Sequence, residues 1–496
     1  MSTRVPRPWR IALTYLPGVL VFVAIYGLTL ARGGGFLYDE RFLIMQALDP
    51  LALDRYPVAV LASLHTQPPL MNTLYFLTDS VPSALGWVMA AAALVTVVLV
   101  TDTVRAAGAG RRWAAVAGAA YALLPATVLY SLFPYSTTVT ALFATVTVWG
   151  VARSRTWRAY GLAISAVGMV GLFLTRASFA WWVVLGWFVA LVLLAWRRRH
   201  REGVRAGGPA LATALGLGVL SVVLVQGHYT AAFGIPTLSS WSGENVSNAL
   251  IAVGLSDDAK ARLSAADPCF AQLIAAQAWG PVEVYGPCIE PDEPIRGGTP
   301  ALDLLVRSGP AGGINYNAGA RLALADEWNR FARAAVQEEP SAVLRIVTGS
   351  AVREGSLARF MGRSDIYFET LEIPKATAPA VWNVLGVWSA VFPWLAWVLV
   401  LAAAAMGATV RRIRRGLPTA FWFGLALLVL HGVPSILGDY GENQRFRAEL
   451  DGVLLATAAL GLWVLVTAAT SRRGEGAVTP PGSPPSGTSP LPADHR

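Results

Sequence analysis

Long blocks of apolar residues recur along most of this chain, and they constrain its fold more than any other feature. A helix needs roughly 20 apolar residues to cross the hydrocarbon core of a bilayer. Only 14% of the 496 residues are charged, against about 25% in soluble domains. The sequence therefore predicts a polytopic α-helical membrane protein with about ten transmembrane helices, or nine to thirteen if blocks are split or merged. The ten blocks are 11–31, 82–101, 114–131, 133–151, 159–175, 177–196, 208–227, 381–410, 417–437 and 450–470.

The placement of arginine predicts the orientation of these spans. Cytoplasmic links between spans are enriched in Arg and Lys. With the ten spans above, all six basic clusters fall on one side, so we expect both termini in the cytoplasm. The net charge of +9 follows from this pattern and does not indicate nucleic-acid binding. The clusters are Arg4, Arg7 and Arg10; Arg105, Arg111 and Arg112; Arg153, Arg155 and Arg158; Arg197, Arg198, Arg199 and Arg201; Arg411, Arg412, Arg414 and Arg415; and Arg472 and Arg473.

This orientation divides the chain into four predicted parts. An N-terminal transmembrane module covers residues 1–227 and includes the first outer loop, 32–81. A polar extracytoplasmic domain covers 228–380, and further transmembrane helices cover 381–470. The Pro-, Ser- and Gly-rich residues 471–496 are predicted as a disordered cytoplasmic tail. The inner links are short and basic, so any chemistry is expected on the outer face.

The predicted extracytoplasmic domain is expected to be largely helical and to contain a disulfide. Apolar residues at three- and four-residue spacing predict helices over 248–263 and 321–336. The two cysteines of the chain, Cys269 and Cys288, both lie in this domain. On the oxidising side of a membrane they favour one disulfide, worth roughly 3 kcal/mol for a loop of about 20 residues. A metal site is the alternative, and it would require further ligands.

Two acidic residues stand just beyond the first apolar block. Asp39 and Glu40 lie near the outer interface, where carboxylates must be solvated or neutralised. His65 follows in the same loop, and residues 41–53 and 66–78 are predicted as short interfacial helices. A carboxylate pair with a histidine suits acid–base chemistry. An ordinary hydrated loop with a helix cap at Asp39 explains the same residues equally well.

Three arginines at the outer ends of predicted spans are candidate phosphate ligands. Arg176 ends one span, and Arg445 and Arg447 precede the last one. A planar guanidinium can hold phosphate oxygens with two parallel hydrogen bonds. The alternatives are extension toward lipid headgroups or pairing with nearby acids: Asp439, Glu442 or Glu449.

The first loop carries two short motifs, Asp39-Glu40-Arg41-Phe42 and His65 followed by Pro68, Pro69 and Leu70. They resemble the motifs of the GT-C glycosyltransferases, in particular the branch with protein O-mannosyltransferases, aminoarabinose transferases and the RgtA/B/C/D-like bacterial enzymes. An Asp-Glu pair with an Arg and an aromatic residue follows the first span, and His-x-x-Pro-Pro-Leu comes about 25 residues later. The architecture is also similar, with a large outer segment after the seventh span and an Arg-aromatic pair before the last. The matching motif residues are Asp39, Glu40, Arg41, Phe42, His65, Pro68, Pro69 and Leu70.

The resemblance implies roles for the acidic pair and for the arginine that follows it. Asp39 would be the general base that deprotonates the acceptor hydroxyl, and Glu40 would orient the acceptor or help to hold a divalent cation. Relatives carry the Arg three residues after the Asp, whereas Arg41 lies two after it, so its substrate-binding role departs from the pattern. For His65 the sequence itself leaves two explanations open: it ligates a metal ion with Glu40, or it caps an interfacial helix.

The expected function is that of a hexosyl- or pentosyltransferase of the cell membrane. It would move a sugar from a polyprenyl-phosphate donor to an envelope glycan, lipid or protein on the extracytoplasmic face, with inversion. A flippase for lipid-linked glycans and a non-catalytic envelope-assembly scaffold are the rivals. Three tryptophans of the large outer segment, Trp241, Trp279 and Trp328, could stack on a sugar, but an aromatic core is the favoured explanation.

Overall fold

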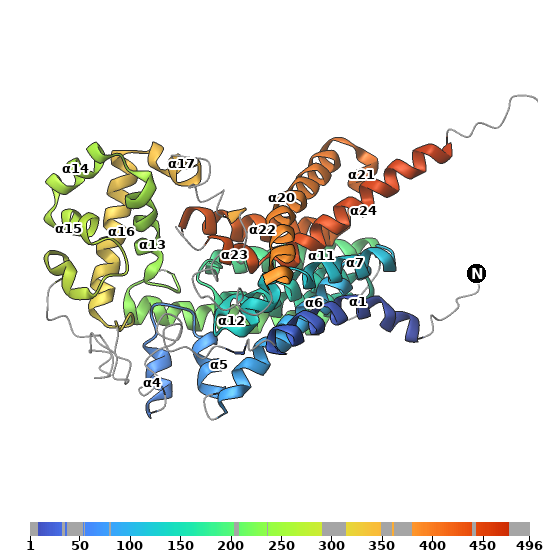
Figure 1. Ribbon diagram of the computed structural model, residues 1–496, viewed down its shortest axis with the longest axis horizontal. Helices are drawn as coiled ribbons and strands as arrows, with labels where there is room; N and C mark the ends of the chain where they lie inside the picture. The colour runs from blue at the N-terminus through green and yellow to red at the C-terminus, as the bar shows by residue number, and fades with distance from the viewer. Residues whose placement is uncertain are drawn as a thin grey trace, which may run out of the picture.

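The structure is a computed structural model that describes residues 8–31, 35–36, 53, 55–78, 81–202, 208–235, 237–289, 314–348, 360–361, 379–438 and 443–475. Asp39, Glu40 and Arg41 lie outside these residues, as do all but residue 53 of the helix predicted over 41–53 and most of the predicted tail. The described part of the chain is helical, with long helices gathered into a bundle and shorter ones into a separate lobe (Figure 1).

The bundle contains α1 (Pro8–Ala31), α6 (Pro82–Ala106), α7 (Arg111–Ala122), α8 (Pro125–Leu129), η1 (Tyr130–Leu132), α9 (Ser136–Trp157), α10 (Ala159–Thr175), α11 (Trp181–Glu202), α12 (Gly208–Phe233), α20 (Pro379–Thr409), α21 (Arg411–Gly416), α22 (Thr419–Gly438), α23 (Asn443–Ala448) and α24 (Asp451–Glu475). Two short helices, α4 (Pro57–Ala62) and α5 (Leu70–Thr78), project from it. The lobe contains α13 (Trp241–Ala249), η2 (Leu250–Gly254), α14 (Asp257–Ala266), α15 (Pro268–Ala276), η3 (Val282–Cys288), α16 (Ala320–Glu338) and α17 (Ser341–Thr348).

Seven of the described helices are long and apolar enough to cross a membrane: α1, α6, α11, α12, α20, α22 and α24. An eighth span results if Arg111–Ala122 and Pro125–Leu132, which meet at 64°, are counted together. The break falls where it should, because Pro125 disfavours a helical conformation at the residue before it, and Leu124 is extended. The two remaining predicted spans correspond to the short helix α10 and to the threonine-rich α9. The predicted polytopic helical architecture is confirmed.

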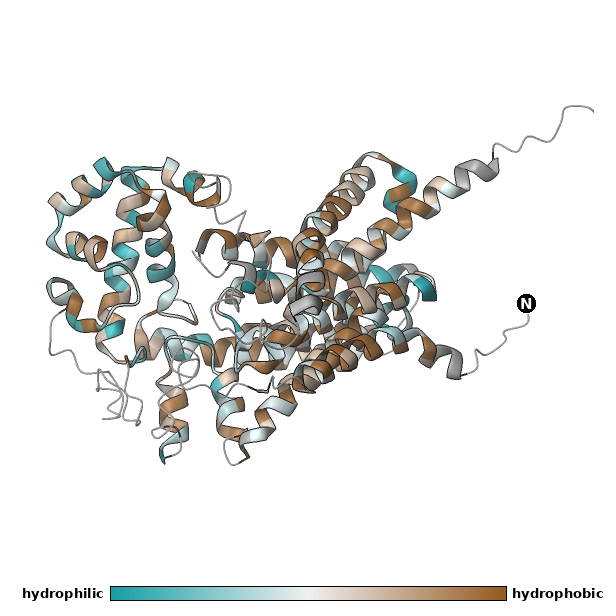
Figure 2. Ribbon diagram, viewed as in Figure 1, coloured by the Kyte–Doolittle hydropathy of each residue, from teal (hydrophilic) through white to brown (hydrophobic). Residues whose placement is uncertain are grey.

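The surface of the bundle matches a lipid environment. Figure 2 shows mostly apolar residues along the helices of the bundle and a mixture of polar and apolar residues along those of the lobe. The peripheral helix α12 leaves Leu217, Val223 and Leu224 more than half exposed. In water such a face would be strongly unfavourable, whereas lipid tails solvate it.

Small residues allow α9 and α10 to pack closely. A methyl group added at Gly150 would lie 2.5 Å from the backbone nitrogen of Ser165, and one at Gly161 would lie 2.5 Å from that of Ser154. Small residues at helix contacts let backbones approach and gain van der Waals contact where lipid provides no hydrophobic driving force. This pair positions both Ser136, at the start of α9, and Arg176, just after α10.

A buried carboxylate joins three helices at the arginine-rich end of the bundle. Asp102 is 3% exposed, and it accepts hydrogen bonds from the Tyr15 hydroxyl (2.5 Å), Trp149 Nε1 (2.6 Å) and Arg153 Nε (2.6 Å). It also accepts two from Arg105. Helices α1, α6 and α9 are therefore joined at one point. Arginines from two of the predicted cytoplasmic clusters thus lie at the same end of the bundle, opposite the end where α10 reaches Arg176.

The lobe has its own hydrophobic core. Phe270, Trp328 and Phe331 are buried in it and pack edge to face. A disulfide joins Cys269 of α15 to Cys288 of η3. The helix expected over 321–336 lies within α16, but that expected over 248–263 is divided. The Ser256 hydroxyl caps α14 by accepting from the amide of Ala259, which begins a new helix there.

Candidate functional site

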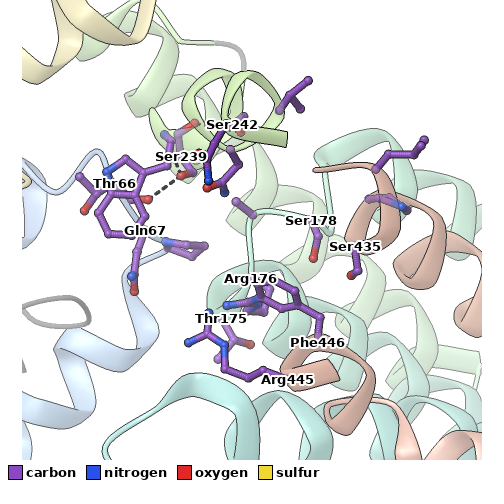
Figure 3. A pocket seen from close by; sticks show the side chains of 18 of the residues that line it. Thr66, Gln67, Thr175, Arg176, Ser178, Ser239, Ser242, Ser435, Arg445 and Phe446 are labelled. Atoms are coloured by element: carbon purple, nitrogen blue, oxygen red, sulfur yellow. Dashed lines mark hydrogen bonds between the residues drawn. The ribbon is translucent and has the colours of Figure 1, made fainter. Parts of the chain in front are cut away.

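A cavity of about 580 Å³ lies where the bundle meets the lobe. Three regions distant in sequence line it, as Figure 3 shows. Thr66, Gln67 and Pro68 come from the first loop. The bundle contributes Thr175, Arg176, Ala177, Ser178, Pro434, Ser435, Leu437, Arg445 and Phe446. The lobe and the chain leading into it contribute Ser239, Trp241, Ser242, Asn245, Val246, Asn248 and Trp279.

Arg176 enters the cavity because α10 ends immediately before it. Its backbone is extended, with φ −141° and ψ 126°. Its Nε lies 3.3 Å from Glu449 Oε2, and its guanidinium carbon lies 4.1 Å from the centre of the Phe446 ring. The buried carboxylate and the ring hold the guanidinium in place while it remains part of the cavity lining. The pairing with Glu449 that the sequence offered as an alternative is thus present alongside the cavity position.

Arg445 lies beside Arg176 in the cavity, as Figure 3 shows. Its guanidinium carbon is 4.9 Å from the centre of the Phe446 ring and 5.0 Å from that of Tyr135. Phe446 therefore contacts both guanidinium groups. Among the described residues that line the cavity, the charged ones are these two arginines. A cavity with two fixed positive charges favours an anionic ligand.

Arg447 has a different environment from Arg445. It is 1% exposed, and its Nε donates to Asp451 Oδ1 at 3.0 Å while Nη1 donates to the carbonyl of Phe360 at 3.2 Å. It is not among the described cavity-lining residues. The structure therefore brings Arg445, and not Arg447, together with Arg176.

A chain of polar side chains lies behind the cavity wall. The Ser178 hydroxyl, which lines the cavity, is 3.0 Å from His431 Nδ1. His431 Nε2 lies 3.1 Å from Glu449 Oε2, and the imidazole stacks on Phe179 with ring centres 4.8 Å apart. Glu449 thus contacts both His431 and Arg176. This arrangement fixes the orientation of Ser178 relative to the guanidinium groups.

His65 is buried and anchors the first loop to the lobe. Its amide donates to Asn317 Oδ1 (2.9 Å), and its Nδ1 is 2.9 Å from the Ser240 hydroxyl. Burial lowers the pKa of His65 to about 4, so the imidazole is neutral at neutral pH. Helix α4 ends at Ala62 and α5 begins at Leu70, so His65 lies between the two rather than at a cap. It positions Thr66 and Gln67 on the cavity.

The described residues around His65 do not form a metal site. No group of three or more His, Cys, Asp or Glu side chains in the described part of the chain could hold a metal ion. The metal site expected from Glu40 and His65 involves a residue outside that part.

The lobe wall of the cavity contains two indole rings. Trp241 and Trp279 pack edge to face with ring centres 5.0 Å apart, and both line the cavity. Trp328 is fully buried in the lobe core. The core position expected for all three tryptophans is therefore found for Trp328, whereas the other two face the cavity.

Sequence reasoning missed most of the uncharged polar lining. Ser178 lies two residues after Arg176, and Gln67 lies within the first-loop motif, so closeness to a predicted site residue was an available signal for both. The lobe residues Ser242 and Asn245 carry no such signal. Their position depends on how the lobe docks on the bundle.

Comparisons with known proteins add little. No protein-family model matches the chain, and no curated protein matches it. The structure is similar to the crystal structure of an oligosaccharyltransferase from Archaeoglobus fulgidus in complex with zinc and sulfate, with a TM-score of 0.41 and 11% identity. The similarity covers 92% of this chain and 50% of that one, so the chain spans about half its length. A similarity at this level assigns neither family nor activity.

Proposed function

We propose that this chain is an integral-membrane glycosyltransferase of the GT-C type. It transfers a hexosyl or pentosyl group from a polyprenyl-phosphate donor to a glycan, lipid or protein of the cell envelope. The observation that carries the proposal is the cavity in which Arg176 and Arg445 meet the first-loop residues Thr66 and Gln67. The resemblance of the first-loop motif supports the same assignment.

In this proposal the two arginines bind the donor phosphate. Displacement at the anomeric carbon breaks the bond to the phosphate oxygen, which leaves with the electron pair. The guanidinium groups of Arg176 and Arg445 offset the charge that develops there. Phe446 keeps both groups facing the cavity through its ring face. The buried Glu449 lies 3.3 Å from Arg176 Nε and keeps that guanidinium group at the cavity wall.

The proposed base is Asp39 in the same first loop. Its carboxylate takes the proton of the acceptor hydroxyl as the acceptor oxygen attacks the anomeric carbon. A single displacement of this kind inverts the anomeric centre. Glu40 orients the acceptor, and Arg41 and His65 support substrate binding, His65 by holding Thr66 and Gln67 in place.

Under this proposal the chemistry takes place on the extracytoplasmic face of the membrane. By the positive-inside rule, the arginine-rich end of the bundle is cytoplasmic and the cavity end is extracytoplasmic. Residues 1–227 and 381–470 then form the transmembrane part, 228–380 the extracytoplasmic domain and 471–496 a cytoplasmic tail.

The test is a transfer assay with the purified full-length chain in lipid nanodiscs. The donors are a panel of polyprenyl-phosphate hexoses and pentoses, and the acceptors are envelope fractions. A general base contributes about 10²- to 10⁴-fold, so Asp39→Asn is expected to lose that much activity. Arg445→Lys keeps the charge but loses the planar, stacked group, and it is expected to lose at least about 10-fold.

Two exposed substitutions on the lobe serve as matched controls. Asp257→Asn and Arg262→Lys change the same chemical groups far from the cavity, and both are expected to keep full activity. Normal transfer by a well-folded Asp39→Asn variant would refute the catalytic assignment. Transfer by Arg445→Lys at the wild-type rate and donor KM would refute the phosphate-binding role.

A further inference from the structure

The lobe wall of the cavity has a composition unlike that of the bundle wall. The bundle wall carries both arginines, whereas the described lobe residues that line the cavity are uncharged. Trp241 and Trp279 supply aromatic surface there, and Ser242 and Asn245 supply a hydroxyl and an amide. Apolar and aromatic surface with a few placed polar groups is typical of sites that bind small molecules, and the uncharged lining of this wall favours a neutral ligand. One ligand class that fits both features is a sugar ring, with C–H bonds on its faces and hydroxyls around its edge.

The turn that carries Trp279 is conformationally unusual. Trp279 has φ +70° and Gln277 has φ +59°. Residues other than glycine rarely have a positive φ, and a bulky aromatic residue with such a backbone conformation is an outlier. Glycine at position 279 would remove the strain, yet the sequence places an indole there. Strained backbone of this kind persists when the surroundings enforce it, and it clusters at functional sites.

A buried ion pair enforces this turn. The Trp279 amide donates to Glu244 Oε1 at 2.8 Å, and Arg321 Nη1 lies 3.4 Å from the same oxygen. Arg321 Nη2 also donates to the carbonyl of Gly280. Glu244 and Arg321 are 3% and 2% exposed. The buried ion pair thus fixes the backbone of this turn, from which Trp279 lines the cavity.

A second set of hydrogen bonds holds the ends of the turn. The Tyr285 hydroxyl donates to the carbonyl of Gln277 at 2.5 Å and accepts from the Gly280 amide at 3.0 Å. Trp241 and Tyr316 pack edge to face on the Trp279 ring, at 5.0 and 6.2 Å between ring centres. The indole therefore faces the cavity from a fixed position and loses little freedom when a ligand binds.

We propose that Trp241 and Trp279, with Ser242 and Asn245, form a saccharide-binding subsite. A neutral sugar ring lies against the indole surface, and its hydroxyls bond to the serine and asparagine side chains. The inference rests on the proposed function, under which Arg176 and Arg445 hold the phosphate on the opposite wall. The ring belongs either to the acceptor glycan or to the sugar of the donor, and both have the same recognition chemistry.

Direct binding tests the subsite independently of catalysis. The probes are neutral hexose and pentose oligosaccharides of two to six units, added to the full chain in nanodiscs and followed by saturation-transfer NMR. The wild type is expected to bind at least one of them. Trp279→Gly removes the ring and relieves the left-handed backbone, so it is expected to lose at least about 10-fold in affinity while keeping its melting temperature. Trp279→Asn, which also tolerates this backbone, guards against a folding effect of glycine.

Two comparisons separate the saccharide subsite from the proposed glycosyltransferase activity. Trp182→Ala removes an exposed indole outside the cavity lining and is expected to leave binding unchanged. Polyprenyl phosphate without a sugar is expected to bind Trp279→Gly as it binds the wild type, but to bind Arg445→Lys more weakly. In the transfer assay, a raised KM for the acceptor assigns the ring to the acceptor, and a raised KM for the donor assigns it to the donor.

The outcomes are distinguishable. Oligosaccharide binding that depends on Trp279 supports the subsite even if none of the donors is used. Absence of oligosaccharide binding by the wild type, or equal binding by wild type and a folded Trp279→Gly variant, overturns the subsite even if transfer occurs.

Discussion

Acidification is expected to loosen the contact between the first loop and the lobe, because His65 is buried as a neutral imidazole. Burial lowers its pKa from 6.5 to about 4. In the closed state the first loop is bonded to the lobe, and in the open state this contact is broken and His65 is exposed to water. Above pH 6.5 the side chain is neutral in both states, so the free energy of opening does not depend on its titration. As the pH falls from 6.5 toward 4, the open state takes up a proton that the closed state does not, so the closed state loses stability. Below pH 4 both states are protonated, and no further loss occurs.

The magnitude follows from the two pKa values. The full difference corresponds to roughly 3 kcal/mol at 1.36 kcal/mol for each pKa unit. Between pH 7 and pH 5 the expected loss is roughly 2 kcal/mol. Opening breaks the hydrogen bond from the His65 amide to Asn317 and that from the Ser240 amide to the His65 carbonyl. These two amides therefore report the opening locally.

Hydrogen exchange measured by mass spectrometry at pH 7 and pH 5, corrected for the intrinsic exchange rates, tests this expectation. His65→Gln keeps a hydrogen-bonding side chain but does not titrate, so its opening free energy is expected to change less with pH than that of the wild type. His200→Gln, near the end of α11 and remote from this contact, controls for loss of a histidine elsewhere. Equal pH dependence in the wild type and His65→Gln would refute the reasoning, as would stronger protection at pH 5.

Two further predictions concern the bundle. Asp102→Asn leaves Arg105 and Arg153 facing a neutral side chain, and breaking a buried ion pair costs about 3–5 kcal/mol. The melting temperature of this variant should fall clearly, whereas Asp257→Asn, at an exposed position, should leave it unchanged. Phe446→Leu removes the ring that contacts both cavity arginines, and the loss is about 0.5–1 kcal/mol for each cation–π contact. The donor KM of this variant should therefore rise roughly 5- to 30-fold, whereas that of Phe446→Tyr should stay near the wild-type value. An unchanged donor KM in the leucine variant would contradict the phosphate-binding role.

The features that could be predicted from the sequence are those that depend on residues close together along the chain. Membrane-spanning helices are marked by length and apolarity alone, so the helical architecture followed from the apolar blocks. Arg176 was a candidate because a charge at the end of a span is costly without a partner. Arg445 was a candidate because the resemblance implies an Arg-aromatic pair before the last span. Position along the sequence could not separate Arg445 from Arg447, because the difference lies in which side chain meets Asp451 and which meets Phe446.

Contacts between distant segments were beyond sequence reasoning. His65 meets Asn317, 252 residues away, and this contact makes it a buried anchor rather than a cap. The cavity position of Trp241 and Trp279 likewise depends on how α13 docks against α22. A tryptophan in a folded lobe is more often core than ligand surface, and only the docked lobe distinguishes Trp328 from the other two.

The first-loop segment 63–67 links the two walls of the cavity. Asn317 binds the carbonyl of Ser63 and the amide of His65, and the Ser239 hydroxyl donates to the carbonyl of Thr66 at 2.6 Å. The Tyr229 hydroxyl at the end of α12 donates to the carbonyl of Gln67 at 2.8 Å. The segment is thus bonded to the lobe on one side and to the bundle on the other. The distance between the proposed phosphate wall and the proposed saccharide wall therefore depends on the hydrogen bonds that this one segment makes to both.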